Sequence, residues 1–192
     1  MTPTTVRDIR VGVAPVGESA TLAAKVIAAH IEGFLKLPCR LLPGMQSPEF
    51  AFDTGRLQYE AGRIIEDFEA RPLGGCQKVV CVLSVDLFVP VFSHVFGEAR
   101  LDGRVALVSL YRLGQAAHGR PPEPDRVLAR AAKVALHELG HLFALTHCDD
   151  PACLMHFAGD CDDLDRSQVL FCRYCRLFLA DAQAADQASR FR

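Results

Sequence analysis

The sequence feature that most constrains this chain is the run from His137 to His147, which reads HELGHLFALTH. His137 and His141 are four residues apart, and on an α-helix residues at that spacing point from one face on consecutive turns. Two imidazoles placed in this way can bind one zinc ion. Apolar residues repeat at helical spacing from Asp125 onward, so the sequence predicts a helix that carries both histidines.

Glu138 and His147 complete this motif. Glu138 is expected beside the metal, where a general base can take a proton from a zinc-bound water. On a continuing helix His147 would point about 240° away from His141. We therefore expect the helix to end near Ala144, so that the chain turns and His147 becomes a third ligand. Three histidines leave one coordination position open, as in catalytic zinc sites. The alternative is a buried helix with incidental histidines.

Four of the eight cysteines follow the last histidine in two short-spaced pairs. Cys148 and Cys153 form a C-x4-C pair, and Cys172 and Cys175 form a C-x2-C pair. These spacings predict a closed four-thiolate zinc site that holds the acidic, loop-rich segment after His147. The alternatives are two disulfides or free thiols, and a reducing cytosol disfavours disulfides.

The other four cysteines carry less information. Cys39, Cys76 and Cys81 lie in or beside predicted strands and are expected to be small core residues. Cys161 lies between the two pairs, and its role stays open.

Composition limits the class of protein. The chain has 192 residues, half of them hydrophobic, and a net charge of −2. That length and composition predict one globular domain, and the weak charge argues against a nucleic-acid partner. No stretch approaches the roughly 18 apolar residues that a membrane-spanning helix needs. We expect a cytoplasmic protein with no membrane partner, and a monomer.

The order of expected elements favours a mixed, largely parallel sheet packed with helices. Strands are expected at 9–15, 39–42 and 78–85, with a hairpin of 92–99 and 104–110; helices are expected at 18–37, 56–70, from 125, and at 174–187. The first helix is expected to bury a stripe that includes Leu22 and Phe34, and the second a stripe that includes Leu57. Residues 114–123 are predicted to form a polar surface loop.

With these residues in hand, the sequence resembles the archaemetzincins, a cytosolic branch of the metzincin zinc peptidases. The shared signature is HExxHxxGxxH, then C-x4-C-x-M, then about seventeen residues and C-x-x-C. It includes Met155, which follows Cys153 at the expected spacing. The segments 95–99 and 109–113 also resemble the family and extend the likeness over most of the chain.

The resemblance implies a fold and a site. The implied fold is an α/β (α+β) metzincin-like fold with an active-site helix and a small C-terminal subdomain held by zinc. We place the subdomain boundary between residues 1–147 and 148–192. Two zinc ions per chain are implied: a catalytic ion on the three histidines, with Glu138 as base and Met155 in the turn beneath it, and a structural ion on the four cysteines.

The implied activity is hydrolysis of peptide bonds in a peptide or protein substrate. Metzincin-like architecture would place the substrate along an edge strand, with 96–99 and 105–109 as candidates. The sequence departs from the family pattern at Ala144, where the family has glycine. Because glycine tolerates positive φ, this departure keeps an alternative open: a two-zinc binding or regulatory module without turnover.

Overall fold

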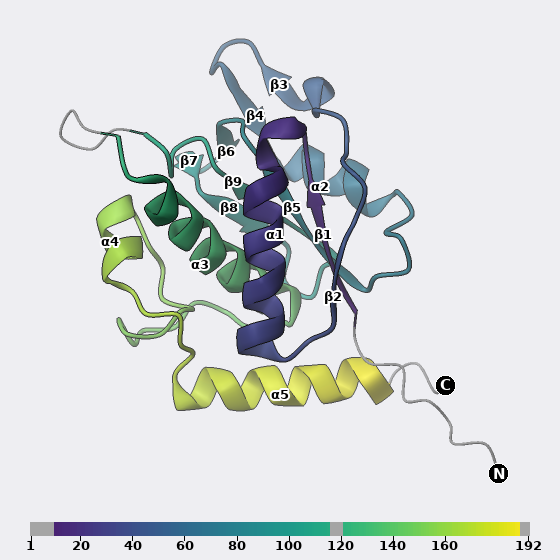
Figure 1. The fold of residues 1–192 in the computed structure, drawn as a ribbon, viewed down its shortest axis with the longest axis vertical. Helices are drawn as coiled ribbons and strands as arrows, with labels where there is room; N and C mark the ends of the chain where they lie inside the picture. The colour runs from purple at the N-terminus through teal and green to yellow at the C-terminus, as the bar shows by residue number, and fades with distance from the viewer. Residues whose placement is uncertain (1–9, 116–120, 189–192) are drawn as a thin grey trace.

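A five-stranded sheet forms the centre of the computed structural model, which describes residues 10–115 and 121–188 (Figure 1). Its strand order is β2-β1-β5-β9-β8. The strands are β1 (Val11–Pro15), β2 (Cys39–Leu41), β5 (Lys78–Leu83), β8 (Gly97–Ala99) and β9 (Val105–Ser109). Neighbours run parallel except β8, which is antiparallel to β9. The predicted mixed, largely parallel sheet is confirmed.

Side chains of the central strands point alternately to the two faces of the sheet, and each face packs into its own hydrophobic core. Every residue of β5 is buried, as expected for a strand covered on both faces. Val80 and Val82 join the core with α1 (Thr21–His30) and α3 (Pro124–Leu142), whereas Val79 and Cys81 join the core with α2 (Ala61–Glu69). Figure 1 shows α1 and α3 covering one face of the sheet and α2 the other.

A second, four-stranded sheet corrects part of the hairpin prediction. Its order is β3-β4-β6-β7, with β3 (Phe52–Asp53), β4 (Gln58–Glu60), β6 (Leu87–Val89) and β7 (Phe92–Val95). The expected first arm at 92–99 is split: β7 pairs with β6, and only β8 pairs with β9. Local sequence pattern does not separate the two strands because only Phe96 lies between them.

The first helical segment is confirmed, but the predicted buried stripe is wrong. Leu22 and Phe34 are 61% and 51% exposed, whereas Ala23, Ala24 and Ile27 are buried. Consecutive helical residues point about 100° apart, so a one-residue error turns the predicted stripe by about 100° away from the core. The segment begins with a 3₁₀ turn at Glu18–Ala20 and continues beyond α1 as a π-helical turn at Ile31–Leu35.

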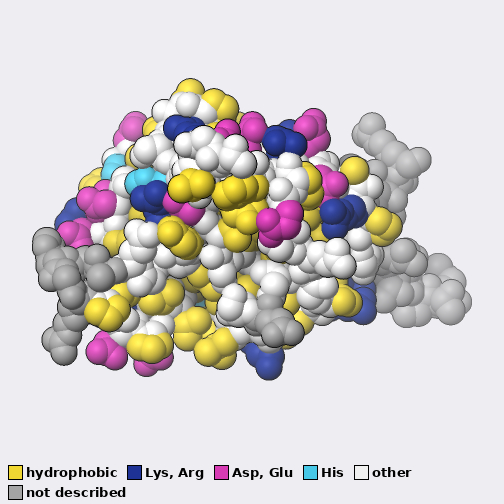
Figure 2. All heavy atoms as spheres, turned by 90° about the horizontal axis from the view of Figure 1, so that it is seen from above, with side chains coloured by type: hydrophobic (Ala, Val, Ile, Leu, Met, Phe, Trp, Pro, Cys, Tyr) yellow, Lys and Arg dark blue, Asp and Glu magenta, His cyan; other side chains and the backbone are white. Residues whose placement is uncertain are grey.

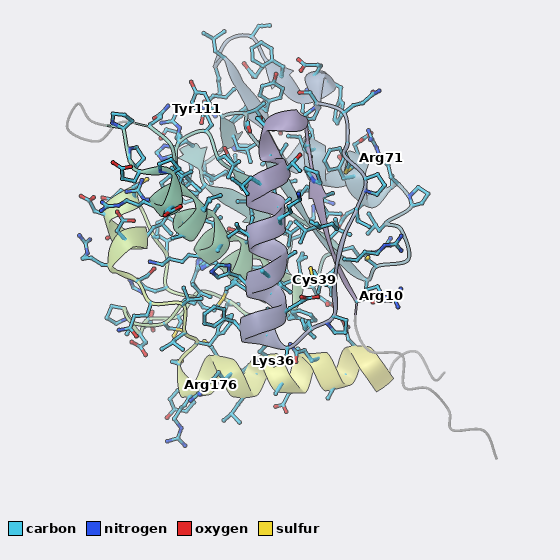
Figure 3. The ribbon with its side chains drawn as sticks, in the orientation of Figure 1. Arg10, Lys36, Cys39, Arg71, Tyr111 and Arg176 are labelled. Carbon is cyan, nitrogen blue, oxygen red and sulfur yellow. The ribbon has the colours of Figure 1, made fainter. Side chains whose placement is uncertain are left out.

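The loop from α1 to β2 turns at Lys36, which adopts a positive φ of 55° at the foot of the helix (Figure 3). The second helix starts later than expected, because β4 occupies part of its predicted range. Leu57 also has a positive φ and is 73% exposed, so its predicted burial is wrong. The 3₁₀ turn Glu49–Ala51 and β3 occupy part of the segment that connects β2 to β4.

After α3 the chain forms α4 (Cys161–Arg166) and α5 (Arg173–Ala188). The last helix matches its prediction, whereas α4 falls in the segment expected to be loop. Figure 1 shows α5 lying across the foot of the molecule, below α1. Met155, Leu164 and Leu179 enter the same core as α1 and α3. The subdomain boundary after residue 147 stays a prediction. Of the predicted loop at 114–123, residues 116–120 lie outside the described residues.

Charged side chains of both signs are interspersed on the face shown in Figure 2, with hydrophobic side chains between them. This distribution agrees with the weak net charge of the sequence. Within residues 10–115 and 121–188, no helix combines the length and apolar character needed to cross a bilayer.

Candidate metal centre and active site

The predicted helix for the two histidines is α3, a 19-residue helix that begins with proline at its first turn. Proline suits that position because its missing N–H has no helical partner there and its φ is already helical. Ala131, Ala135 and Leu139 are buried in the core and fix the rotation of the helix. His137 and His141 are therefore held toward the cleft on one side of α3.

α3 ends at Leu142, close to the end near Ala144 that His147 needs in order to turn back toward the other two histidines. The N–H of Ala144 donates to the carbonyl of His141 (2.9 Å), and the N–H of Leu145 donates to the carbonyl of Gly140 (3.1 Å). These two bonds form a Schellman motif, in which the first residue past the helix adopts a left-handed conformation. Ala144 has that conformation, with φ of 61°. The predicted turn is confirmed, and it redirects the chain so that His147 returns toward the helix.

The three histidines converge. One ligand nitrogen from each lies within 4.8 Å of the others. The Nε2 atoms of His137 and His141 are 3.1 Å apart, and the His147 ring lies 5.2 Å and 4.9 Å from the two other ring centroids. The alternative of incidental histidines on a buried helix does not account for this convergence.

Backbone carbonyls orient two of the rings. Nδ1 of His137 lies 2.7 Å from the carbonyl of Leu154, and Nδ1 of His141 lies 2.7 Å from the carbonyl of Leu145. A carbonyl can only accept, so Nδ1 donates and Nε2 is left with its lone pair toward the shared centre. Burial lowers the pKa of His137 to about 4 and also lowers the pKa of His141 and His147. Neutral imidazoles are the form that binds a metal.

These donors fit a zinc ion. Zinc binds imidazole nitrogen at about 2.0–2.1 Å in tetrahedral geometry, which separates two such nitrogens by about 3.3 Å. The observed Nε2–Nε2 distance of 3.1 Å is close to that value. The site offers three neutral imidazole nitrogens, and backbone carbonyls orient two of the three rings. This donor set is that of an open zinc site.

Glu138 lies next to this centre and is 7% exposed. Burial raises its pKa well above the usual value, and the nearby Glu98 raises it further. Glu98 lies on the edge strand β8, where burial raises its own pKa. Gly97 precedes it and packs directly on Glu138: a Cβ at residue 97 would lie 2.7 Å from Glu138 Cγ. The edge strand and the glutamate therefore form one wall.

A cleft of about 780 Å³ contains these groups. β7 and β8 form one side, α3 forms the floor, and the segment after Met155 with α4 forms the other side. Phe92 and Phe157 stack across the cleft with ring centroids 6.0 Å apart, and Phe157 also contacts the His147 ring at 5.4 Å. The cleft is thus closed on one side by aromatic rings beside the third histidine.

Met155 lies beneath the histidines and has no exposed surface. Its Sδ would lie 2.5 Å from a Cβ at Gly140, so a residue with a side chain does not fit between the two histidines of α3. The carbonyl of Met155 accepts from Cys148 N–H at 2.9 Å. This bond ties the turn below the three histidines to the start of the cysteine cluster.

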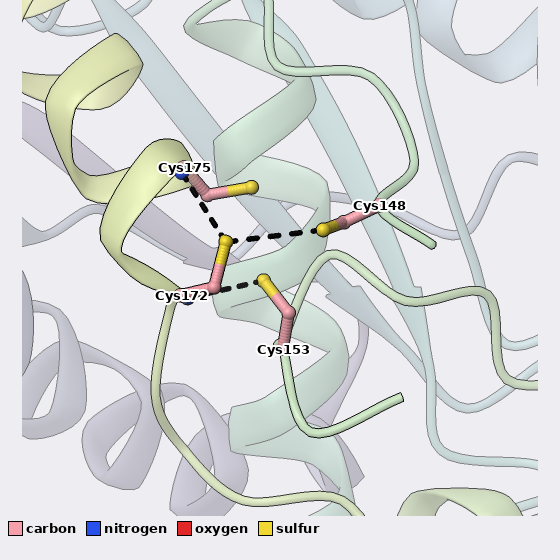
Figure 4. Close-up of side chains that lie close together, drawn as sticks. All are labelled: Cys148, Cys153, Cys172 and Cys175. Atoms are coloured by element: carbon pink, nitrogen blue, oxygen red, sulfur yellow. Dashed lines mark hydrogen bonds between the residues drawn. The ribbon is translucent and has the colours of Figure 1, made fainter. Parts of the chain in front are cut away.

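The four predicted cysteines also converge (Figure 4). Their sulfurs lie within 4.8 Å of one another, and Cys148 Sγ is 3.9 Å from Cys172 Sγ. Backbone N–H groups of Cys172 and Cys175 point at the sulfurs of Cys153 (3.3 Å) and Cys172 (3.4 Å). All eight cysteines are free thiols, so the disulfide alternative is not what the structure contains.

The cysteine cluster fits a tetrahedral zinc ion as well. Zinc–sulfur bonds of about 2.3 Å separate the sulfurs by about 3.8 Å. The backbone N–H of Cys175 lowers the pKa of Cys172 to about 7, so one thiolate forms readily. Burial raises the pKa of Cys175, and without a cation that thiol stays protonated.

Within residues 10–115 and 121–188, the remaining cysteines and histidines lie outside both clusters. Cys76 and Cys81 are buried and Cys39 is half-buried, as expected of core residues. Cys161 Sγ lies 3.8 Å from the carbonyl of Arg112 and is in neither ligand group. His94 and His156 line the cleft, and His156 Nδ1 bonds to the carbonyl of Cys148 at 2.9 Å.

Sequence reasoning placed Gly97 and Glu98 in the candidate substrate strand 96–99 but did not predict their closeness to Glu138, and it did not single out Lys133, which also lines the cleft. The first two reach Glu138 only because β8 packs on α3, a contact that no local pattern encodes. Lys133 could have been found, because it precedes His137 by four residues on the same helix face.

Comparisons with known proteins agree with this geometry. The profile of Peptidase family M54 matches residues 26–180. Archaemetzincin of Pyrococcus horikoshii is 37% identical over 145 residues, which cover 71% of this chain and 74% of the relative. Archaemetzincin of Methanopyrus kandleri is 38% identical over 128 residues, covering 67% and 69%.

Solved structures show the same fold. The crystal structure of the Methanopyrus kandleri archaemetzincin superposes with a TM-score of 0.81 at 29% identity, covering 96% of this chain and 99% of that one. The structure of a zinc-dependent peptidase from Methanocorpusculum labreanum has a TM-score of 0.79 at 26% identity, covering 88% and 99%. The chain therefore belongs to Peptidase family M54, the family of the archaemetzincins, and is a zinc metallopeptidase.

Proposed function

We propose that this chain hydrolyses peptide bonds at the three-histidine centre, with Glu138 as the general base. The observation that supports the proposal is the convergence of His137, His141 and His147 beside a buried carboxylate in an open cleft. His137, His141 and His147 would hold a zinc ion through one ring nitrogen each. The ion would supply Lewis acidity, which lowers the pKa of a coordinated water and polarises the substrate carbonyl.

The proton of the attacking water is transferred by Glu138. Glu138 accepts a proton from the attacking water and then donates it to the leaving amine. One carboxyl group serves both steps, first as the acceptor and then as the donor of the same proton. Gly97 packs against the Glu138 side chain and limits where it can point.

The free edge of β8 would bind the substrate backbone. β8 pairs with β9 on one side, and it is the last strand of the sheet as ordered in the described part of the chain. An extended peptide can add to such an edge through main-chain hydrogen bonds. Of the two strands expected from the sequence, 96–99 is thus favoured, because 105–109 corresponds to β9 between β5 and β8.

A second zinc ion, held by Cys148, Cys153, Cys172 and Cys175, would serve the structure rather than the reaction. Four thiolates leave no open position. The cluster connects the chain just after His147 to the start of α5, so it would fix the approach of the third histidine. Free thiols together with a four-cysteine site suit a reducing compartment, which supports a cytoplasmic location.

The competing function is a two-zinc binding or regulatory module without turnover. Ala144 favours it, because a residue with a side chain occupies a left-handed position at the turn before His147. The cost of that conformation is about 1–2 kcal/mol, which is small against the roughly 10 kcal/mol that zinc binding can contribute.

The test is cleavage of a mixed peptide library by the zinc-loaded protein, with cleavage sites identified by mass spectrometry. We expect defined cleavage sites that disappear in Glu138→Ala, while zinc content measured by mass spectrometry stays unchanged. Equal cleavage by the two proteins, or none by either, would support the module without turnover.

A further inference from the structure

Lys133 lies in the cleft but has no part in the mechanism above. It is on α3, four residues before His137, so its side chain leaves the same helix face about 6 Å along the axis. It is half-buried, and burial lowers its pKa. A lysine in such a place loses hydration that a partner must replace.

The partners that Lys133 has are neutral. Its Nζ donates to the carbonyls of Leu164 (2.5 Å) and Ser167 (2.7 Å), at the end of α4. An ammonium group has three donors, so two bonds leave one donor over. Across residues 10–115 and 121–188, no carboxylate lies within ion-pair distance of Nζ. Backbone oxygens solvate the positive charge, and Asp165, which acts on it from beyond ion-pair distance, is bound to Arg130.

The carboxylates nearby are engaged elsewhere. Asp165 binds the guanidinium of Arg130 with both oxygens, at 2.8 Å and 2.7 Å. Asp163 binds Arg166 and the N–H of Gly159. Glu98 lies near enough to Glu138 to raise its pKa, and within the described residues neither carboxylate forms an ion pair with Lys133. Among the described residues, Lys133 is therefore a cation of this cleft that has no carboxylate bound directly to its ammonium group.

The surroundings of Lys133 suit a short aliphatic chain that ends in a charge. Val134, Leu154, Ala158 and Leu164 line the same cleft with apolar side chains, and Leu164 also supplies one of the carbonyls that Lys133 binds. Methylene groups of a bound peptide would contact these residues, while the terminal group would meet the ammonium. A free cation between apolar walls selects a ligand with the opposite charge.

We propose that Lys133 is a specificity-determining residue that binds a carboxylate of the peptide substrate beside the cleaved bond. The carboxylate comes either from an aspartate or glutamate side chain or from the C-terminus of the peptide. The proposal rests on the proposed function, because it assigns a subsite of the same cleft. It predicts that this metallopeptidase cleaves next to acidic residues or close to free C-termini.

The test uses paired peptides built on a sequence that the zinc-loaded protein cleaves. The two members of a pair differ only in carrying Glu or Gln at one position, and the positions tested are the two residues before and the two residues after the cleaved bond. Each peptide is made with a free and with an amidated C-terminus. The readout is the ratio of kcat/KM for the two members of a pair. Wild-type protein is expected to favour the acidic member about tenfold at one position, as a charge-assisted hydrogen bond would give.

Two variants separate recognition from folding. Lys133→Met keeps the length of the side chain and removes the charge, and the ratio is expected to fall to within about twofold of unity. Lys25→Met makes the same substitution on the exposed side of α1, and the tenfold ratio should persist. A loss of stability caused by the missing bonds to α4 would change both members of a pair alike and leave their ratio unmoved.

Binding is measured in parallel by isothermal titration calorimetry on the zinc-loaded Glu138→Gln protein, so that the preference is scored without turnover. A ratio near one in the wild type, or a tenfold ratio that survives in Lys133→Met, overturns the proposal. A preference confined to free over amidated C-termini, and lost in Lys133→Met, supports it with the terminal carboxylate as the ligand. If no peptide is cleaved but the binding preference depends on Lys133, the subsite stands and the proposed hydrolysis fails.

Discussion

Gly97 on the edge strand touches Glu138 on the active-site helix so closely that a methyl group does not fit between them. A Cβ at residue 97 would lie 2.8 Å from Oε1 and 2.7 Å from Cγ of Glu138, and 2.7 Å from Cγ1 of Val134. The contact joins the strand that we propose binds substrate to the side chain that we propose moves the proton. Gly97 thereby fixes the distance between these two parts of the cleft.

This contact predicts a loss of activity in Gly97→Ala. The added methyl group would displace the Glu138 carboxylate, and a displacement of about 1 Å in a catalytic group can cost about 100-fold in rate. We expect kcat on a cleaved peptide to fall about 10- to 100-fold while zinc content stays the same. Gly62→Ala is the matched control, because nothing lies within 4 Å of a Cβ there. Wild-type activity in Gly97→Ala would show that Glu138 is not held by this strand.

The left-handed Ala144 predicts a stabilising substitution. Replacing it with glycine removes the steric cost of positive φ, about 1 kcal/mol, at the turn that delivers His147. We expect Ala144→Gly to raise the free energy of unfolding by up to about 1 kcal/mol, measured by urea denaturation of the zinc-loaded protein. Ala29→Gly, in the regular part of α1, should have the opposite sign. A destabilised Ala144→Gly would contradict the left-handed turn.

The ion pair between Arg130 and Asp165 predicts how stability depends on pH. The hydrogen bonds from Arg130 lower the pKa of Asp165 in the folded protein. A lowered folded pKa means that the stabilisation is present above the unfolded value of about 3.9 and is lost as pH falls through the folded pKa. Asp165→Asn should cost about 2 kcal/mol at neutral pH, since it leaves Arg130, whose side chain is 4% exposed, without its carboxylate.

The same comparison carried to low pH is the discriminating measurement. The stability difference between wild type and Asp165→Asn should shrink below about pH 4, because protonation removes the carboxylate from the wild type as well. Asp181→Asn, at an exposed position of α5, serves as the control and should show little difference at any pH. A difference that stays constant from pH 7 to pH 3 would rule out the ion pair as its source.

The two ligand clusters predict how zinc is lost. Cys172→Ser should reduce the zinc content from two ions per chain to one and lower the melting temperature strongly, because metal binding contributes about 10 kcal/mol in structural sites. Cys161→Ser should keep both ions, since its sulfur bonds toward the carbonyl of Arg112 and lies outside the cluster. Metal analysis by mass spectrometry checks both variants. Loss of zinc from Cys161→Ser would reassign the ligands.

The ligand groups could be predicted from the sequence because short spacing encodes them. His137 and His141 are one helical turn apart, and helix geometry alone brings such residues to one face. The cysteine pairs are equally local. The central strand β5 was also predictable, because a continuous apolar run is typical of a strand buried on both faces.

Other features depended on contacts between distant segments. The division of 92–99 into β7 and β8 follows from pairing with β6 and β9, and the burial of Ile27 rather than Leu22 follows from which side of α1 meets the sheet. Both outcomes are set by packing energy summed over the whole core, which local propensity does not contain.

The sequence by itself determined which residues form the two ligand groups and where the active-site helix must end, because both depend on intervals of a few residues and on the geometry of a single helix. Only the tertiary structure decided what surrounds them: Gly97 against Glu138, and Lys133 in the cleft with backbone carbonyls as its hydrogen-bond partners. Those relationships join strand, helix and loop across long stretches of chain, and the energy that fixes them arises only when the segments are packed together.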